Sequence, residues 1–334
     1  MARDQRGAHG GRGEGSVVVG VDGSAHARLA LKWAADEAAV RAGPLDVVCA
    51  QFGKVKGQHV PGWYEFGSSD LSPAEAILDE AVGLVATRQP SVVVRGNVAE
   101  WPPGLILIVA SRPAELLVVG ARGQGGFKGL LLGSVSDQCI QYAHCPVAVV
   151  RSKAEEAVHV SAEPRIVVGV DGSLGSTRAL KWALEEAQRR SASVEAVFAW
   201  QLPPVYAIAK PPSDGYEVAA REITAAATEQ AAVRAPDVPF TASSRLGATV
   251  PALLDACRTA DLLVLGFRGH GGFHDALLGS VADQCAHHAM CSVVVVRPHI
   301  AEEPTAGSSW TGVGLGQTSD GSRPTGRPAP AATG

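Results

Sequence analysis

The hydrophobic residues of this 334-residue chain gather in short apolar runs, which alternate with longer amphipathic stretches. Short runs rich in Val and Leu are typical of buried parallel strands, and the longer stretches have helical periodicity. The pattern predicts strands near 17–22, 45–51, 91–95, 116–120, 146–151, 166–171, 194–200, 240–245, 262–266 and 293–297. It predicts helices near 24–42, 74–88, 98–112, 134–143, 173–191, 217–234, 249–259 and 280–289. This alternation indicates an α/β protein with parallel sheets flanked by helices.

The chain contains a long internal duplication. The segment Val18-Val-Gly-Val-Asp22-Gly-Ser returns at Val167 with an offset of 149, and the 32 residues from Gly120 and from Gly266 share 20 identities. A period of this length is too long for a solenoid and fits two copies of a whole domain. We therefore expect the division 1–15 disordered tail, 16–152 first domain, 153–164 linker, 165–298 second domain and 299–334 disordered tail.

A glycine motif, G-x2-G-x9-G-S, occurs once in each copy, from Gly120 to Ser134 and from Gly266 to Ser280. An apolar strand precedes the motif, and a helix of the Ser-x-x-Asp type follows it. Backbone N–H groups converge where such a loop reaches a helix, which favours anions and above all phosphates. The alternative is that the glycines only form turns and that both serines are helix N-caps. The repeated spacing favours phosphate binding.

Two acidic residues, Asp22 and Asp171, follow the first strand of each copy. In a doubly wound sheet this position lies near the glycine-loop strand, at the point where the strand order reverses. A carboxylate there can accept a base amino group or a ribose hydroxyl, or it can help to start the next helix. Arg122 and Arg268 occupy the same place in both loops, and the sequence leaves open whether they face phosphates or water.

Other classes of function lack their motifs. Neither copy contains a Walker A loop or the full dinucleotide fingerprint, and no catalytic triad of the Ser-His-Asp type is recognisable. A net charge of −4 argues against nucleic-acid binding. No apolar run is long enough to span a membrane and no signal peptide is recognisable, so we expect a cytoplasmic protein. The six cysteines lack zinc-type spacing, so buried thiols are expected and no metal is assigned.

These motifs, together with Leu-Leu-Val-Val-Gly-x-Arg-Gly and a closing Pro-Val-x-Val-Val-Arg, resemble the universal stress protein family in its tandem form. The resemblance implies two tandem Rossmann-like domains, each a five-stranded parallel sheet of order 3-2-1-4-5, and bound ATP with Mg²⁺. It implies a first site at Asp22, Ala50, Gly120, Arg122, Gly123, Gly133, Ser134, Val135 and Ser136. It implies a second site at Asp171, Ala199, Gly266, Arg268, Gly269, Gly279, Ser280, Val281 and Ala282. Ala282 lacks the hydroxyl of Ser136, which is expected to weaken the second site slightly.

The two copies differ before the glycine loop. There are 24 positions from Gly96 to Gly120 but 19 from Gly247 to Gly266, and the longer segment contains Pro102-Pro103. Proline inside a helix removes a hydrogen bond, so we expect a broken or delayed helix and a surface bulge there. The last strand of each copy is an apolar edge, and the two are expected to pair within the chain as a pseudo-dimer.

Three functions are compatible with these patterns. The first is an ATP-binding stress-response protein that senses or stores nucleotide and signals through partners, with a homodimer as a further expectation. The second is a slow ATPase or adenylating enzyme, although no base or metal ligand for one is recognisable. The third is a nucleotide-free scaffold or chaperone-like protein in which the loops are architectural.

Overall fold

The computed structural model of the chain describes residues 15–50, 72–124, 131–151, 164–201, 214–270 and 278–297. In the first copy the elements are β1 (Ser16–Val21), α1 (Ala25–Val40), β2 (Leu45–Ala50), α2 (Ser72–Arg88), β3 (Val94–Ala99), α3 (Pro103–Ala110), β4 (Ala114–Gly120), α4 (Ser134–Tyr142) and β5 (Val147–Val150). In the second they are β6 (Arg165–Gly169), α5 (Leu174–Arg190), β7 (Ser193–Trp200), α6 (Asp214–Arg234), β8 (Phe240–Leu246), α7 (Thr249–Ala256), β9 (Leu262–Gly266), α8 (Ser280–His288) and β10 (Ser292–Val296). The predicted linker and tails lie almost wholly outside the described residues.

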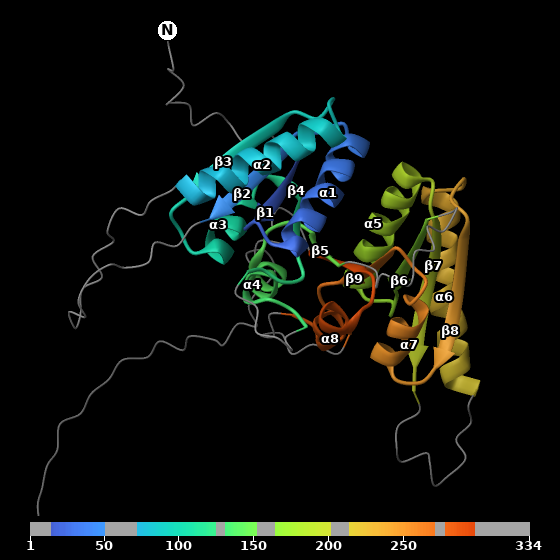
Figure 1. The fold of residues 1–334 in the computed structure, drawn as a ribbon. Coiled ribbons are helices and arrows are strands. Elements are labelled where there is room, and N and C mark those ends of the chain that lie inside the picture. The colour runs from blue at the N-terminus through green and yellow to red at the C-terminus, as the bar shows by residue number, and fades with distance from the viewer. Residues whose placement is uncertain are drawn as a thin grey trace, which may run out of the picture. The chain divides into compact units, whose positions relative to one another are not determined.

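The ten strands of the described residues form one sheet, with the order β3-β2-β1-β4-β5-β10-β9-β6-β7-β8 (Figure 1). The strands within each copy are parallel, so each half has the predicted order 3-2-1-4-5. The order reverses between β1 and β4 in the first copy and between β6 and β9 in the second. Ligands of doubly wound sheets bind beyond the strand ends at these reversal points.

Alternate residues of the central strands face opposite layers of helices. Val17 and Val19 of β1 pack into the core beneath α1 and α2, whereas Val18 packs with Leu107 of α3 and Ile140 of α4. This is the two-residue period of a strand that is buried on both faces. It explains why the strand sequences are continuous apolar runs.

The third strand and third helix of the first copy differ from the prediction. The strand begins at Val94 and ends at Ala99, later than the predicted 91–95, and the helix covers only 103–110 of the predicted 98–112. Pro103 is the first helical residue, where proline is favoured because the N–H of that position is not used by the helix. The helix is delayed, as expected, but it is not broken.

The expected surface bulge is wrong. Gly96 lies inside β3, where a Cβ atom would be 3.0 Å from a methyl carbon of Leu78, whereas Gly247 directly follows β8. The two glycines are therefore not equivalent positions of the repeat. The unequal spacing results from comparing them and does not correspond to an insertion in the structure. Helices α3 and α7 each have eight residues and correspond at the same offset of 146 as the glycine loops.

The two copies join through β5 and β10, which pair with each other as predicted and run antiparallel. Ala148 lies opposite Val294, its own equivalent in the second copy, and Val147 and Val149 lie opposite Val295 and Val293. Such a register is self-complementary, as in the interface of a two-fold dimer. Both apolar edges are covered by this pairing.

Two arginines reinforce this junction by crossing it in opposite directions. Arg151 follows β5 and donates to the carbonyl oxygens of Ala286 and His287 at the end of α8. Arg297 follows β10 and donates to the carbonyl oxygen of Ile140 at 3.0 Å, near the end of α4. Positive charge at a helix C-terminus is favourable because unpaired carbonyl groups point there.

A buried ion network connects α1 with α5. Arg41 donates to Glu37 at 2.9 Å and to Glu186 at 2.7 Å, while Arg190 contacts the same two carboxylates. Both glutamate residues are fully buried. Glu37 corresponds to Glu186 and Arg41 to Arg190, both at an offset of 149, so the network repeats itself across the junction.

Tryptophan rings support the arginines of this network. The Arg41 guanidinium carbon is 5.8 Å from the ring centre of Trp182, and that of Arg190 is 4.9 Å from the ring centre of Trp33. Each arginine therefore lies over an aromatic face of the opposite copy, which adds a cation–π attraction to the ion pairs. Burial and the neighbouring Glu186 carboxylate raise the pKa of Glu37 to about 7.

Candidate functional site

Helices α1 and α5 begin with conventional serine caps. The hydroxyl oxygen of Ser24 accepts a hydrogen bond from the Ala27 amide at 3.2 Å, and that of Ser173 accepts one from the Ser176 amide at 3.1 Å. A serine N-cap supplies an acceptor for an amide that the helix itself leaves without one. The first turns of these two helices are therefore partly satisfied by the protein.

Helices α4 and α8 begin differently. Their N-caps are Gly133 and Gly279, both in extended conformation, and within the described part of the chain neither helix has a side-chain capping bond. Ser134 and Ser280 are the first helical residues, so the alternative interpretation of these serines as N-caps is wrong. The first-turn amides of α4 and α8 are available to an external acceptor, and the helix dipole favours an anion there.

The glycines that end β4 and β9 allow α1 and α5 to pass close to these strands. A Cβ atom on Gly120 would lie 2.8 Å from the carbonyl carbon of His26. One on Gly266 would lie 2.5 Å from the carbonyl carbon of Gly175. Because these obstacles are backbone atoms, no larger residue fits at either position without moving a helix.

The carboxylate of Asp22 connects the end of β1 with the glycine loop. Its Oδ1 atom accepts from the Ser24 amide at 2.9 Å, and its Oδ2 atom accepts from the Gln124 amide at 2.8 Å. A Cβ atom on Gly123 would lie 2.5 Å from Oδ2. The structure therefore gives Asp22 the helix-starting contact that the sequence left as an alternative, and a second contact that positions the loop.

Asp171 makes the same contacts in the second copy. It accepts from the Ser173 amide at 2.9 Å and from the His270 amide at 3.1 Å. Burial raises the pKa of Asp171, but the hydrogen bonds from Ser173, Ser176 and His270 outweigh burial, and the net shift is downward. The ionised form is therefore the one that the surrounding loops stabilise.

Replacing this carboxylate tests its positioning role. Asp171→Asn should lower the free energy of unfolding by about 1.5–3 kcal/mol at pH 7, because hydrogen bonds to an ionised acceptor are stronger than those to an amide. A group with a lowered folded pKa stabilises above its unfolded pKa, and that contribution is lost as pH falls through the folded value. The difference from wild type should thus shrink under acid conditions. Urea unfolding at several pH values measures it, with the exposed Asp237→Asn as the control.

A cavity of about 780 Å³ lies beyond the carboxyl ends of β6 and β9. All of the residues predicted for the second site line it: Asp171, Ala199, Gly266, Arg268, Gly269, Gly279, Ser280, Val281 and Ala282. Sequence reasoning missed other lining residues, including Ser176, Thr249, His270 and Gln141. Gln141 belongs to α4 of the first copy and could be found only from the pairing of β5 with β10. The volume is in the range typical of small-molecule sites.

In the first copy, two predicted site residues besides Asp22 contact the protein itself. The hydroxyl group of Ser136 is buried and donates to the Gly120 carbonyl oxygen at 2.6 Å. A guanidinium nitrogen of Arg122 lies 3.3 Å from Nε2 of His26. Burial, followed by the charge of Arg122, lowers the pKa of His26, which favours the neutral imidazole beside the arginine. Arg122 thus lies at the N-terminus of α1.

The remaining predicted residues follow their strands and helices. Ala50 ends β2, and Gly133, Ser134 and Val135 form the start of α4. Residues 125–130 and 271–277 of the glycine motifs lie outside the described part of the chain.

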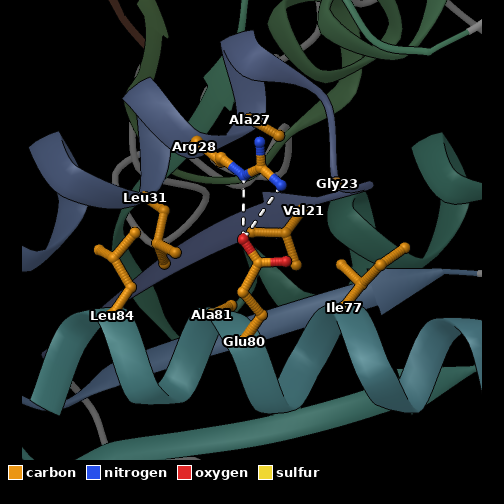
Figure 2. A pocket seen from close by; sticks show the side chains of 9 residues that line it. All are labelled: Val21, Gly23, Ala27, Arg28, Leu31, Ile77, Glu80, Ala81 and Leu84. Atoms are coloured by element: carbon orange, nitrogen blue, oxygen red, sulfur yellow. Dashed lines mark hydrogen bonds and ion pairs between the residues drawn. The ribbon is translucent and has the colours of Figure 1, made fainter.

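A hollow in the first copy is too small for a ligand. It lies between α1 and α2, has a volume of about 20 Å³, and is lined by Gly23 and Ile77 among others (Figure 2). Arg28 of α1 and Glu80 of α2 form an ion pair of 3.0 Å across it. In the second copy Thr177 replaces Arg28, and the corresponding hollow has about 250 Å³. None of the predicted site residues lines either hollow.

The fold and the paired glycine motifs define a tandem α/β protein in which the same glycine motif stands at both reversal points of the sheet. The sequence pattern of the universal stress protein family matches residues 15–151 and 164–297, and the chain belongs to this family. A universal stress protein of Mycolicibacterium smegmatis is 32% identical over 299 residues, covering 85% of this chain and 98% of that protein. One of Mycobacterium tuberculosis is 33% identical over 297 residues, covering 86% and 98%.

The arrangement of the two domains has a counterpart among solved structures. The crystal structure of a universal stress protein from Archaeoglobus fulgidus matches 85% of this chain and 98% of its own, with a TM-score of 0.58 at 17% identity. This likeness concerns the fold. In the described part of the chain, no helix is both long and apolar enough to cross a membrane.

Proposed function

We propose that this protein binds ATP, with Mg²⁺, at one site in each domain. The observation that carries the proposal is the cavity of about 780 Å³ in the second domain, because all of the residues expected from the glycine motif line it. The cavity also contains the start of α8, whose glycine N-cap leaves its first-turn amides without a side-chain acceptor. Phosphate groups are the ligands that such amides favour.

The expected contacts follow from the positions of these residues. In the second domain, the phosphates lie against the backbone of Gly279, Ser280, Val281 and Ala282, and Arg268, which lines the same cavity, assists. The adenine ring and ribose lie toward Asp171, Ala199 and the glycines that end β9. Asp171 keeps its loop contacts while a ligand hydroxyl or amino group donates to it, since a carboxylate has several acceptor positions.

In the first domain the equivalent set is Asp22, Ala50, Gly120, Arg122, Gly123, Gly133, Ser134, Val135 and Ser136. The Ser136 hydroxyl already donates to the Gly120 carbonyl, so its backbone amide is the group offered to phosphate. Ala282 has the same backbone amide. Its missing hydroxyl is therefore no reason to expect weaker phosphate binding at the second site. We propose a role in cytoplasmic stress response and signalling in which the bound nucleotide is sensed or stored.

Calorimetric titration of the full chain with Mg-ATP tests the proposal. We expect saturable binding that approaches two molecules per chain. At a ligand concentration of 100 times Kd, the free energy of unfolding should rise by about 2.7 kcal/mol for each occupied site, which thermal unfolding measures independently. Absence of binding at millimolar Mg-ATP would contradict the proposal and favour a nucleotide-free scaffold. Release of phosphate that depends on Asp22, Asp171, Ser134 or Ser280 would instead support an enzyme.

A further inference from the structure

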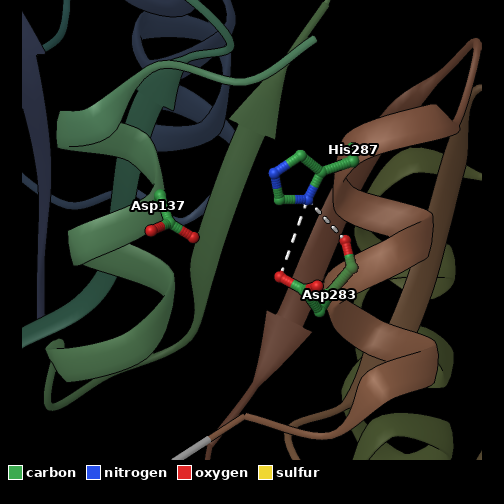
Figure 3. Close-up of side chains that lie close together, drawn as sticks. All are labelled: Asp137, Asp283 and His287. Carbon is green, nitrogen blue, oxygen red and sulfur yellow. Dashed lines mark hydrogen bonds and ion pairs between the residues drawn. The ribbon is translucent and has the colours of Figure 1, made fainter. Parts of the chain in front are cut away.

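Two aspartates from different domains lie close together at the junction. Asp137 is the fourth residue of α4 and Asp283 the fourth residue of α8, so they occupy equivalent positions in the two copies. The self-complementary pairing of β5 with β10 brings these helices face to face (Figure 3). Among the described residues, neither carboxylate forms an ion pair with a lysine or arginine. Two like charges facing each other repel, and a cation between them would relieve that repulsion.

The third member of this cluster is His287, one helical turn after Asp283. One ligand atom from each of Asp137, Asp283 and His287 lies within 4.8 Å of the other two. All three side chains are partly buried, so they are held in place while remaining accessible to an ion from solvent. An aspartate and a histidine four residues apart on one helix project from the same face and can share a ligand.

The histidine is oriented in the manner of a metal ligand. Its Nδ1 atom lies 2.9 Å from the carbonyl oxygen of Asp283. A carbonyl can only accept, so Nδ1 carries a proton, and in the neutral imidazole Nε2 then has the lone pair that can bind a metal. Figure 3 shows this second ring nitrogen on the side that faces Asp137. Metal-bound histidines usually donate their other N–H to a carbonyl or carboxylate, which fixes the tautomer.

The first domain differs at the equivalent position. Gln141 stands where the second domain has His287, and its amide donates to the Asp137 carboxylate at 2.9 Å. This contact holds Asp137 in place without neutralising it. The complete cluster therefore combines two carboxylates, one imidazole and a supporting amide, and it needs both domains.

From this geometry we propose that Asp137, Asp283 and His287 bind one divalent transition-metal ion per chain across the domain junction. Zinc is the expected class, because imidazole and carboxylate oxygen are ligands that it accepts, and water completes a tetrahedral set. Ligand bonds of about 2.0–2.2 Å require the three donor atoms to approach by roughly 1 Å. Side chains that are only partly buried have the freedom to do so. The ion would fasten α4 to α8 beside the second cavity, which Gln141 and Asp283 also line.

Titration of the full chain, without an affinity tag and without nucleotide, with Zn²⁺ tests this assignment. We expect saturation at one ion per chain and a higher unfolding temperature. Asp137→Asn and His287→Gln should each weaken binding tenfold or more, although they lie in different domains. His287→Gln introduces the residue that the first domain has at the equivalent position, Gln141, so this variant is expected to fold. His288→Gln, which alters an exposed neighbour outside the cluster, should bind as wild type does.

Co²⁺ provides a second readout, because its visible spectrum distinguishes nitrogen and oxygen ligands from thiolates. Weak bands without thiolate charge transfer support the assignment. Thiolate bands would place the ion on the buried cysteines and overturn it, as would the absence of saturable binding or equal affinity in all variants. Because the titration contains no nucleotide, its failure would leave the ATP proposal intact.

Discussion

Gly279→Val should reduce ATP binding from two molecules per chain to one, with an affinity loss of about 100-fold at the second site, or about 2.7 kcal/mol. An N-cap side chain lies over the first-turn amides of its helix, and valine fills that space without accepting a hydrogen bond. The backbone at Gly279 is extended, with φ of −70° and ψ of 139°, which suits a β-branched residue. A Cβ atom there would be 3.1 Å from the Phe267 carbonyl oxygen, so only a small local shift is needed.

Calorimetry with Mg-ATP measures the stoichiometry and affinity of this variant. Gly133→Val is the matched variant of the first domain, where the nearest atom to a Cβ would be the Arg122 Cα at 3.4 Å. It should remove the other site, and the double variant should bind no ATP. Gly279→Ala is the control for backbone effects and should lose much less affinity. Unchanged binding in both valine variants would show that the nucleotide does not use the starts of α4 and α8.

The largest stability effect is expected at the ion network between α1 and α5. Glu186→Gln should lower the free energy of unfolding by about 3 kcal/mol at pH 6. Burial, the largest cause of the raised Glu37 pKa, persists in this variant and keeps Glu37 from fully replacing the lost charge beside Arg41 and Arg190. Glu37→Gln should cost less than 1 kcal/mol at that pH. Its carboxyl group has a pKa raised to about 7 and is already largely protonated. The two residues are equivalent in the repeat, which makes them matched variants.

The same difference predicts a pH dependence. A carboxyl group whose folded pKa is raised stabilises at low pH, and this contribution is lost as pH rises through the folded value. Wild-type stability should therefore fall between about pH 5 and pH 7, by at most about 1.4 kcal/mol per pH unit, and Glu37→Gln should remove this slope. Urea unfolding measures both effects. The proton would be wrongly assigned to Glu37 if Glu186→Gln and Glu37→Gln lowered the free energy of unfolding equally. It would also be wrongly assigned if the stability of Glu37→Gln still fell between pH 5 and pH 7.

The order of strands and helices was predictable from the sequence because most strands are buried on both faces and form continuous apolar runs. The bounds of the third strand were not predictable, because β3 lies at the edge of the sheet and its side chains are half exposed. The apolar run at 92–94 placed the predicted strand too close to the N-terminus, although Val93 is 66% exposed. Only pairing of Val94 with Leu45 fixes where this strand begins.

The glycine motif located the candidate site, but local sequence did not determine how the loop is capped. Serine is a common N-cap, so Ser134 and Ser280 were plausible ones, whereas the backbone places Gly133 and Gly279 there. The ion network was also hidden in the sequence. Glu37 and Arg41 are four residues apart on a helix, a spacing typical of exposed ion pairs, and only the second domain buries them.

The self-complementary junction of β5 with β10 has a consequence for how the two halves can diverge. In an assembly of two identical chains, every substitution appears on both sides of the axis. Here the halves are covalently joined, so a change in one half leaves the other untouched, and their association does not depend on protein concentration. His287 opposite Gln141 and Ala282 opposite Ser136 are such one-sided changes. One half can thus acquire new chemistry while its counterpart preserves the original.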